Sequence, residues 1–283
     1  MSPIQPRPAR QLRNGVFTPV EDALIVEEPL EIRLDNRRYT ATMRTPGETQ
    51  NDDFLLAQGL LFSEGVISSL EDVEKMEFRA RCRDLSDELV NVVNVTLHDA
   101  SSVPAHLWER SLISNSSCGL CGKASVEALS ARFEPLQKAD LDLENIRDLP
   151  DKMRPHQKLF DQTGGCHAAA IFSSEGELLC CFEDIGRHNA TDKSLGFGLE
   201  NGFIPATEPL ILLVSGRASF EIVQKALVAR IATLCSVSAA SSLAVDLAVK
   251  NNLNLVGFVR PRGLTVYTEI CNHEVTRMNT NKM

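Results

Sequence analysis

Long hydrophobic runs are missing from the sequence, and this absence excludes a transmembrane helix. No stretch approaches the roughly 18 consecutive apolar residues that such a helix needs. Residues 1–14 are polar and rich in proline and arginine, so they lack the apolar core of a secretory signal peptide. We therefore expect a cytoplasmic protein that has no membrane partner and whose thiols are kept reduced.

Positively charged residues are fewer than negatively charged ones, 29 against 38. The formal net charge of −9 argues against a broad nucleic-acid-binding face, although a local basic pocket for a phosphorylated ligand remains compatible with it. A chain of 283 residues can bury a large core without a disulfide or metal staple. In a reducing compartment the 8 cysteines are buried apolar residues, metal ligands or nucleophiles, and not a disulfide framework.

The length favours two domains. The first hundred residues predict a small, mostly antiparallel α+β unit, with extended runs at residues 23–34, 39–45, 73–78 and 88–97 and a helix at 52–62. We expect a flexible tail over residues 1–20. The α+β domain then covers residues 21–150 and ends with the Cys118/Cys121 loop and a helix at about 123–133, and an α/β domain covers residues 151–283.

The second half alternates continuous apolar strands with amphipathic helices. Strands are expected at residues 166–172, 177–182, 210–214, 234–237, 254–259 and 264–267, and helices at 188–197, 219–231 and 241–250. This pattern predicts a three-layer α/β domain with a partly parallel sheet, so the chain as a whole is α/β with an α+β part. Ligands of such sheets bind beyond the carboxyl ends of the strands, which directs attention to the loops at 184–189 and 215–219.

The segment Cys118-Gly-Leu-Cys121-Gly lies between a Ser/Asn-rich loop and a predicted helix. The helix N-terminus and the nearby Lys123 favour the nucleophilic thiolate. The spacing has three chemical interpretations: half a zinc site, a dithiol redox pair or a persulfide carrier. A fourth interpretation, two small buried residues, conflicts with the polar and glycine-rich surroundings.

Two of these interpretations are weakened by context. A zinc site needs a second pair of ligands, and the candidates Cys166 and His167 are adjacent on a predicted strand, so they point to opposite faces. A thioredoxin-like pair should directly follow a strand, which this one does not.

Two loops could hold an anion. Gly186-Arg187-His188-Asn189 and Ser215-Gly216-Arg217 each stand at a strand-to-helix turn, where backbone N–H groups and an arginine can bind phosphate. Arg260 and Arg262 follow the next apolar strand and would extend this pocket. Ordinary helix capping with a solvated arginine is the alternative for each loop taken singly.

Several segments together resemble one known family. They read Ser-Cys-Gly-Leu-Cys-Gly-Lys, Gly-Arg-His-Asn-Ala-Thr-Asp-Lys, Ser-Gly-Arg-Ala-Ser-Phe-Glu-Ile-Val-Gln-Lys-Ala and Leu-Val-Gly-Phe-Val-Arg, preceded by Arg44-Thr45-Pro46-Gly47 and Gly59-Leu-Leu-Phe-Ser-Glu-Gly65. In this order, over about residues 20 to 270, the chain resembles the formate dehydrogenase accessory sulfurtransferases (FdhD/NarQ).

The resemblance implies a sulfurtransferase with a cysteine persulfide intermediate. It would take sulfur from a cysteine desulfurase and deliver it to the bis(molybdopterin guanine dinucleotide) molybdenum cofactor, which is then inserted into formate dehydrogenase. Cys118 would carry the persulfide, with Cys121 as its partner. The resemblance also implies a homodimer and a cytidine deaminase-like larger domain.

The resemblance and the anion loops together name the residues that would bind the cofactor, in particular its guanine nucleotide part. They are Phe258, Val259, Arg260, Pro261, Arg262, Gly263, Ser215, Gly216, Arg217, Arg187 and His188. The deaminases hold zinc with a His-x-Glu and a Pro-Cys-x-x-Cys motif. Neither motif stands at the corresponding loops, so we expect no protein-bound zinc and no deamination. A non-catalytic chaperone that only binds the molybdenum cofactor is the alternative function.

Overall fold

The computed structural model describes residues 2–47, 49, 51–79, 91–103 and 133–268. Cys118 and Cys121, together with the helix expected at about 123–133, lie outside these residues. The chain forms two compact units that are not contiguous in sequence. One contains residues 1–119, 156–168 and 182–200, and the other contains residues 120–155, 169–181 and 201–283.

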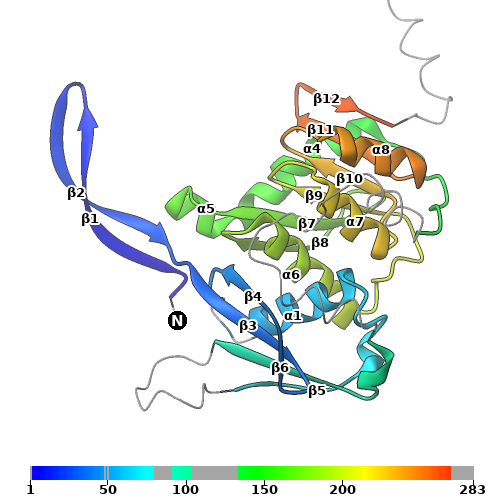
Figure 1. Ribbon diagram of the computed structural model, residues 1–283. Coiled ribbons are helices and arrows are strands. Elements are labelled where there is room, and N and C mark those ends of the chain that lie inside the picture. Colours follow the sequence, from blue (N-terminus) through cyan, green and yellow to red (C-terminus); the bar gives the residue numbers. More distant parts are fainter. Residues whose placement is uncertain (1, 48, 50, 80–90, 104–132, 269–283) are drawn as a thin grey trace, which may run out of the picture. The chain divides into compact units, whose positions relative to one another are not determined.

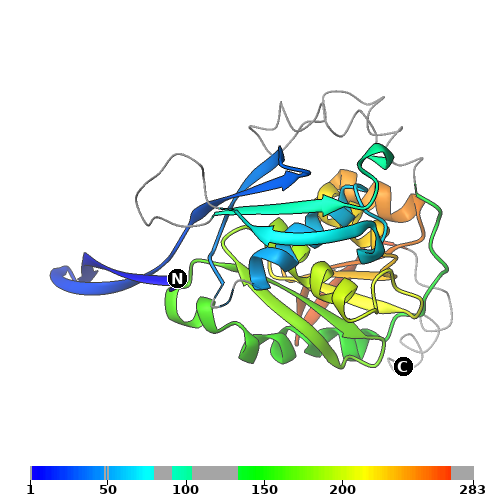
Figure 2. The ribbon, with the colours of Figure 1, turned by 90° about the horizontal axis from the view of Figure 1, so that it is seen from below.

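A four-stranded sheet organises the first unit (Figures 1 and 2). Its strands are β3 (Glu28–Leu34), β4 (Arg37–Arg44), β5 (Val73–Phe78) and β6 (Val92–Leu97), in the order β4-β3-β6-β5. The β3–β6 pair is parallel and the other two pairs are antiparallel, which confirms the mostly antiparallel sheet. Asp35 and Asn36 turn β3 into β4 with φ of 47° and 64°, a conformation that Asn and Asp tolerate better than most residues.

Two helices of the first unit, α1 (Asn51–Ser63) and α6 (Arg187–Glu200), pack against each other at very short range. A Cβ atom at Gly59 would lie 1.9 Å from the carbonyl oxygen of Asp192, and one at Gly196 would lie 2.0 Å from that of Leu55. The two glycines therefore permit backbone-to-backbone contact. The unit also contains the short helix α5 (Lys158–Thr163).

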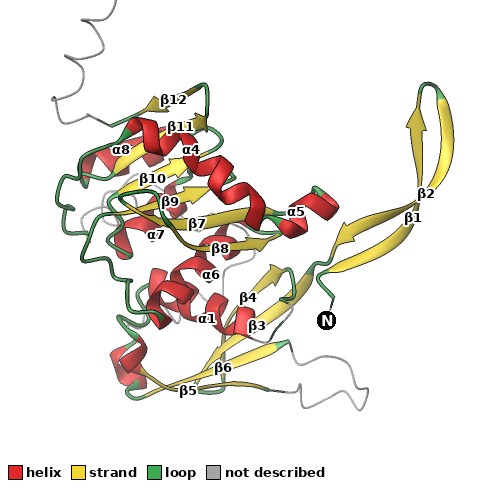
Figure 3. Ribbon diagram, turned by 180° about the vertical axis from the view of Figure 1, so that it is seen from behind, coloured by secondary structure: helices red, strands yellow, loops and turns green. Residues whose placement is uncertain are grey.

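Residues 1–20 are not the tail that the sequence suggested. β1 (Ile4–Arg13) and β2 (Val16–Ile25) form an antiparallel hairpin that is paired along its whole length. Composition was misleading here, because prolines and arginines are compatible with a strand whose edges face solvent. This hairpin is a separate two-stranded sheet, visible in Figures 1 and 3.

The second unit is built on a six-stranded sheet with the order β12-β11-β10-β9-β7-β8. Its strands are β7 (His167–Ser173), β8 (Leu178–Asp184), β9 (Leu210–Val214), β10 (Thr233–Ser236), β11 (Asn254–Arg260) and β12 (Gly263–Val266). The start of β7, up to Ala168, and the end of β8, from Phe182, belong to the first unit. β9, β10 and β11 are parallel to one another, as the alternation of strands and helices predicted.

Helices cover both faces of this sheet. α7 (Phe220–Val228) and α8 (Ser242–Lys250) lie on one face and α4 (Leu143–Met153) lies on the other, as Figures 1 and 3 show from opposite sides. The expected three layers are therefore present, and every residue of β9 and β10 is buried between them. The domain boundary expected near residue 150 falls inside α4, because Pro150 stands within that helix.

The described residues also include short 3-10 turns at Leu70–Asp72, Ala100–Ser102 and Arg154–His156. The mixed α/β class is confirmed. None of the helices in the described part of the chain has the length and apolar character that crossing a membrane requires.

Candidate functional site

The carboxyl ends of β9 and β10 carry two loops that are tied together. Because the strands are parallel, both loops emerge at the same edge of the sheet. The hydroxyl of Ser236 lies 2.7 Å from the carbonyl oxygen of Gly216 and 3.0 Å from that of Ser238. It also accepts the backbone N–H of Ser238 at 3.1 Å. One buried serine therefore holds both loops in register.

Backbone bonds reinforce this arrangement. Ala218 donates its N–H to the carbonyl oxygen of Ala239 at 3.0 Å, and Ser241 donates its N–H to that of Ala218 at 3.0 Å. The loops lead directly into α7 and α8, whose N-termini therefore start from neighbouring positions at this edge. Helix N-termini attract negative charge, so the edge suits an anionic ligand.

Phe258 presents an aromatic ring at the same edge. Its backbone N–H donates to the carbonyl oxygen of Ser238 at 3.0 Å, which links β11 to the loop after β10. Its φ of 52° lies in the left-handed region, which is rare for a bulky residue and is often retained where it serves function. The side chain is 46% exposed, whereas Val259 beside it is fully buried. The bulge between Gly257 and Arg260 thus turns a large apolar side chain into solvent.

Among the other predicted residues of this unit, Ser215 is half-buried and Gly216 is buried, whereas Pro261 and Gly263 are exposed. Arg217, Arg260 and Arg262 are all exposed, and Pro261-Arg262 form the turn between β11 and β12. Arg147 of α4 donates to the carbonyl oxygen of Pro261 from both Nε, at 2.8 Å, and Nη2. The fully buried side chain of Val259 belongs to the core, so only its backbone is available to a ligand.

Arg187 and His188 belong to the first unit, at the start of α6. The sequence grouped them with the loops of the second unit, and the structure assigns them to a different unit. The Nε atom of Arg187 is buried and has no hydrogen-bond partner within the described residues.

A buried carboxylate, Asp184, organises the turn before α6. It accepts the backbone N–H of Thr45 at 3.2 Å, that of Gly186 at 2.9 Å and the side-chain amide of Asn189 at 3.0 Å. Its cationic partner is Lys193, whose Nζ lies 2.7 Å from Asp184 Oδ2. The side chains of this pair are 0% and 1% exposed, so neither charge can be left alone without a large desolvation penalty.

A second buried ion pair fixes the end of β4. Arg44 binds Asp53 with two parallel bonds, Nε to Oδ1 at 2.7 Å and Nη2 to Oδ2 at 2.9 Å. It also donates to Glu28 at 3.2 Å and to Asn91 at 3.1 Å. Burial alone would lower the pKa of Arg44, but the hydrogen bonds and charges of Asp53 and Glu28 raise it, so the guanidinium stays charged.

The surroundings of Cys166 and His167, which were considered as zinc ligands, shift the pKa values of both side chains. Burial, together with a hydrogen bond of 3.2 Å to Glu183, raises the pKa of the Cys166 thiol, so this cysteine is a poor nucleophile. Burial and the charge of Arg187 lower the pKa of His167. Across the residues that the structure describes, no cluster of three or more His, Cys, Asp or Glu side chains could hold a metal ion.

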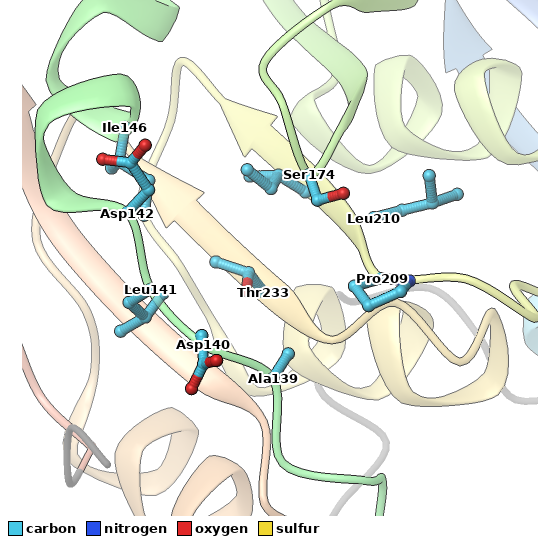
Figure 4. A pocket seen from close by; sticks show the side chains of 10 residues that line it. Ala139, Asp140, Leu141, Asp142, Ile146, Ser174, Pro209, Leu210 and Thr233 are labelled. Atoms are coloured by element: carbon cyan, nitrogen blue, oxygen red, sulfur yellow. The ribbon is translucent and has the colours of Figure 1, made fainter. Parts of the chain in front are cut away.

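A small pocket at the opposite, amino-terminal ends of β9 and β10 is shown in Figure 4. Asp140, Asp142, Leu210 and Thr233 are among the residues that line it. Its volume of about 20 Å³ accommodates a single water molecule, so it cannot hold a nucleotide.

Comparison with known proteins identifies the family. The model of the FdhD/NarQ family matches residues 25–273. Among curated proteins, the Sulfur carrier protein FdhD of Streptomyces avermitilis is 46% identical over 261 residues, which cover 91% of each chain. The protein of the same name from Mycobacterium tuberculosis is 45% identical over 253 residues, covering 87% of this chain and 90% of that one. The chain belongs to the FdhD/NarQ family.

A further relative and a solved structure extend the comparison. The Sulfur carrier protein FdhD of Saccharolobus solfataricus is 42% identical over 252 residues, covering 87% of this chain and 89% of that one. A crystal structure of a formate dehydrogenase accessory protein from Desulfotalea psychrophila has a TM-score of 0.71, with 22% identity, 95% coverage of this chain and 98% of that one. It shares the fold of this FdhD/NarQ member.

The matched region of this family member contains the Cys118/Cys121 segment and the edge built around Ser236 and Phe258. Sequence reasoning had found the loop after β9 but missed Ser236 and the loop after β10. A signal was present, because two serines, Ser236 and Ser238, stand at the carboxyl end of an apolar strand, where polar side chains often serve a ligand site. It also missed the role of Lys193, although that residue closes one of the resembling segments.

Proposed function

We propose that this chain is a sulfurtransferase that carries persulfide sulfur on Cys118. The sulfur would come from a cysteine desulfurase and pass to the bis(molybdopterin guanine dinucleotide) molybdenum cofactor, the substrate, before the cofactor enters formate dehydrogenase. The observation that carries this proposal is the family match over residues 25–273, supported by relatives that are 42–46% identical and named sulfur carriers. We also propose that the protein is a cytoplasmic homodimer.

Sulfur acceptance is an exchange without net oxidation. The thiolate of Cys118 attacks the terminal sulfur of the persulfide on the desulfurase, and a new S–S bond forms on Cys118. The old S–S bond breaks, and its electron pair leaves with the desulfurase cysteine as a thiolate.

Two routes for delivery differ in the product that they leave on the protein. In one, the Cys121 thiolate attacks the inner sulfur of the persulfide, a Cys118–Cys121 disulfide forms, and the terminal sulfur leaves as hydrosulfide. The disulfide must then be reduced by a dithiol reductant. In the other, Cys121 attacks the terminal sulfur and becomes the persulfide itself, while Cys118 returns to the thiolate.

The edge around Ser236 and Phe258 would hold a guanine nucleotide of the substrate. The N-termini of α7 and α8 favour its phosphates, and Arg217 lies in the first of the two loops. The exposed ring of Phe258 offers a face on which a base can stack. Orientation of the phosphates and base by this edge would leave the dithiolene end of the cofactor free for sulfur transfer.

Mass spectrometry tests the carrier chemistry. After incubation with a cysteine desulfurase and cysteine, we expect the peptide that contains Cys118 to gain the mass of one sulfur atom. The Cys118→Ala variant should show no gain on that peptide, and Cys121→Ala should keep it. The carrier proposal fails if the wild-type peptide stays unmodified. If Cys118→Ala still restores formate dehydrogenase activity, the protein is a cofactor-binding chaperone instead.

Nucleotide binding tests the edge separately, with GDP as the probe in isothermal titration calorimetry. We expect Phe258→Ala to weaken binding about tenfold, the usual effect of losing an aromatic stacking partner. Val249→Ala is the matched control, because Val249 is a similarly exposed apolar residue, 55% accessible, in α8 of the same unit. Equal GDP affinity in wild type and Phe258→Ala would contradict the stacking role.

A further inference from the structure

The β1–β2 hairpin, called the arm below, has two faces of different character. Its turn is Asn14-Gly15, with φ of 50° and 81°. Val26 donates its N–H to the carbonyl oxygen of Pro3, so the hydrogen-bonded pairs along the ribbon are those in which β1 contributes odd-numbered residues. The pairs to which β1 contributes even-numbered residues are not hydrogen-bonded, and their side chains lie together on the other face of the ribbon. That face consists of Ile4, Pro6, Pro8, Arg10, Leu12, Phe17, Pro19, Glu21, Ala23 and Ile25.

The face with the even-numbered β1 residues is predominantly apolar, and its half next to the Asn14-Gly15 turn is exposed to solvent. Leu12 and Phe17, which pair across the strands, are 55% and 54% exposed. The guanidinium of Arg10 lies 4.9 Å from the centre of the Phe17 ring, a cation–π contact that orders the tip. Within the described part of the chain, the arm is covered at its base, where Ile25 meets Gly165 beside α5. Leu12 and Phe17 on this face are exposed to solvent at the end of the ribbon among the residues that the structure describes.

The edges of the arm are protected, although this face is not. Pro6, Pro8 and Pro19 occupy positions whose backbone nitrogen points away from the partner strand. Proline has no N–H there, so each edge lacks donors at these positions and pairing with a further strand is disfavoured. The arm therefore suits docking through its side chains and not strand addition. A two-stranded hairpin is also only marginally stable alone in water, so cover on the apolar face would stabilise it.

Charge identifies the surface that fits the arm. On the apolar face, the half next to the Asn14-Gly15 turn carries Arg10 and no acidic residue, whereas Glu21 lies nearer the base. The chain as a whole has a net charge of −9, and exposed carboxylates gather on α4. Glu144, Asp148 and Asp151 share one face of that helix, since they are four and three residues apart.

The basic residues of α4 do not neutralise this face. Arg147 is bound to the carbonyl oxygen of Pro261, and Lys152 donates to that of Gly176 at 2.8 Å. Within the described residues, no ion pair involves Glu144, Asp148 or Asp151. Partly exposed apolar groups, Leu143 and Pro150, are next to these acids and can meet apolar side chains of the arm.

We propose that the arm of one copy docks on the acidic face of α4 in a second copy of this chain, and that the two copies exchange arms. The family match begins at residue 25, at the end of β2, so the arm lies outside the region that defines the family. This inference deepens the homodimer proposed above and is independent of the sulfur chemistry. A reciprocal exchange gives a closed, two-fold symmetric dimer.

Sedimentation velocity of the full chain over a range of concentrations tests the proposal. Wild type should sediment as a dimer. The double variant Leu12→Ser/Phe17→Ser should raise the dimer dissociation constant about tenfold or more, because buried aromatic and aliphatic anchors dominate such interfaces. Val249→Ser removes a side chain with the same 55% exposure as Leu12 and should leave the dimer intact.

Charge-reversed variants test whether the arm docks specifically on the acidic face of α4. Chains carrying Arg10→Glu should be monomeric, and so should chains carrying Asp148→Lys/Asp151→Lys, because each would place like charges in contact. An equal mixture of the two variants should form a heterodimer, since both of its interfaces again join opposite charges. Higher salt should weaken the wild-type dimer.

The outcomes separate the two proposals. A wild-type monomer at all concentrations would overturn the homodimer and the arm exchange together. A dimer that is insensitive to Leu12→Ser/Phe17→Ser would retain the homodimer and overturn the arm. If the mixture of charge-reversed chains stays monomeric, α4 is not the surface on which the arm docks. The persulfide assay is unaffected by any of these results.

Discussion

Replacing Lys193 by methionine tests the buried charge network in the first unit. Methionine keeps much of the length of the side chain but removes the charge that lies 2.7 Å from Asp184. The carboxylate would then be fully buried without its cation. Removing one partner of a buried ion pair destabilises a protein by about 3–5 kcal/mol. Asp184 keeps the donors from Thr45, Gly186 and Asn189, so we expect the low end, about 3 kcal/mol.

Urea unfolding measures this effect. With a slope of about 3 kcal/mol per molar urea, the midpoint should fall by about 1 M. The partner variant Asp184→Asn should also be destabilised, because Lys193 is then left buried and unpaired. The double variant removes both charges. Its loss in the free energy of unfolding should therefore be smaller than the sum of the two single-variant losses by at least about 1 kcal/mol.

Two results would refute this reasoning. A loss below about 1 kcal/mol in Lys193→Met would mean that the pair contributes no more than an exposed one. Additive losses in the double variant would mean that the two charges do not interact. In either case the network around Asp184 would not be what holds the turn before α6.

Three further predictions follow from the geometry. Gly196→Ala should lower the free energy of unfolding by about 1–3 kcal/mol, because the new Cβ would lie 2.0 Å from the backbone oxygen of Leu55 and force α1 and α6 apart. In thermal melts over a pH series, His167→Gln should flatten the loss of stability expected below pH about 6.5. Burial lowers the folded-state pKa of His167, so the unfolded chain binds its proton first as pH falls. Ser236→Ala should weaken GDP binding about fivefold in calorimetry, because the two loops lose their shared hydroxyl.

Controls for these predictions are available in the chain. Gly263→Ala should be neutral for stability, since a Cβ there meets no atom within 4 Å. Replacing the exposed His156 by glutamine gives a matched histidine variant for the same pH series. Unchanged stability in Gly196→Ala, an unchanged pH profile in His167→Gln, or unchanged GDP affinity in Ser236→Ala would each contradict the corresponding argument.

Local patterns predicted most of the secondary structure because they depend on neighbouring residues only. The apolar run at residues 210–214 coincides with β9, and residues 73–78 coincide with β5. The extended runs expected at residues 23–34 and 39–45 overlap β3 and β4 for the same reason. The arm was missed because residues 1–20 have the composition of a tail, although Asn14-Gly15 is a dipeptide typical of a two-residue hairpin turn.

The sequence by itself determined the alternation of strands and helices, the family and the loop after β9. These follow from periodicity and from segments of consecutive residues, which can be read without knowing the fold. The tertiary structure alone decided that Thr45 binds Asp184, 139 residues away, and that Ser236 joins two loops. It also decided that Phe258 faces solvent while Val259 is buried. Such partners depend on sheet order and on a bulge, and chain topology brings them together across distances that no local pattern encodes.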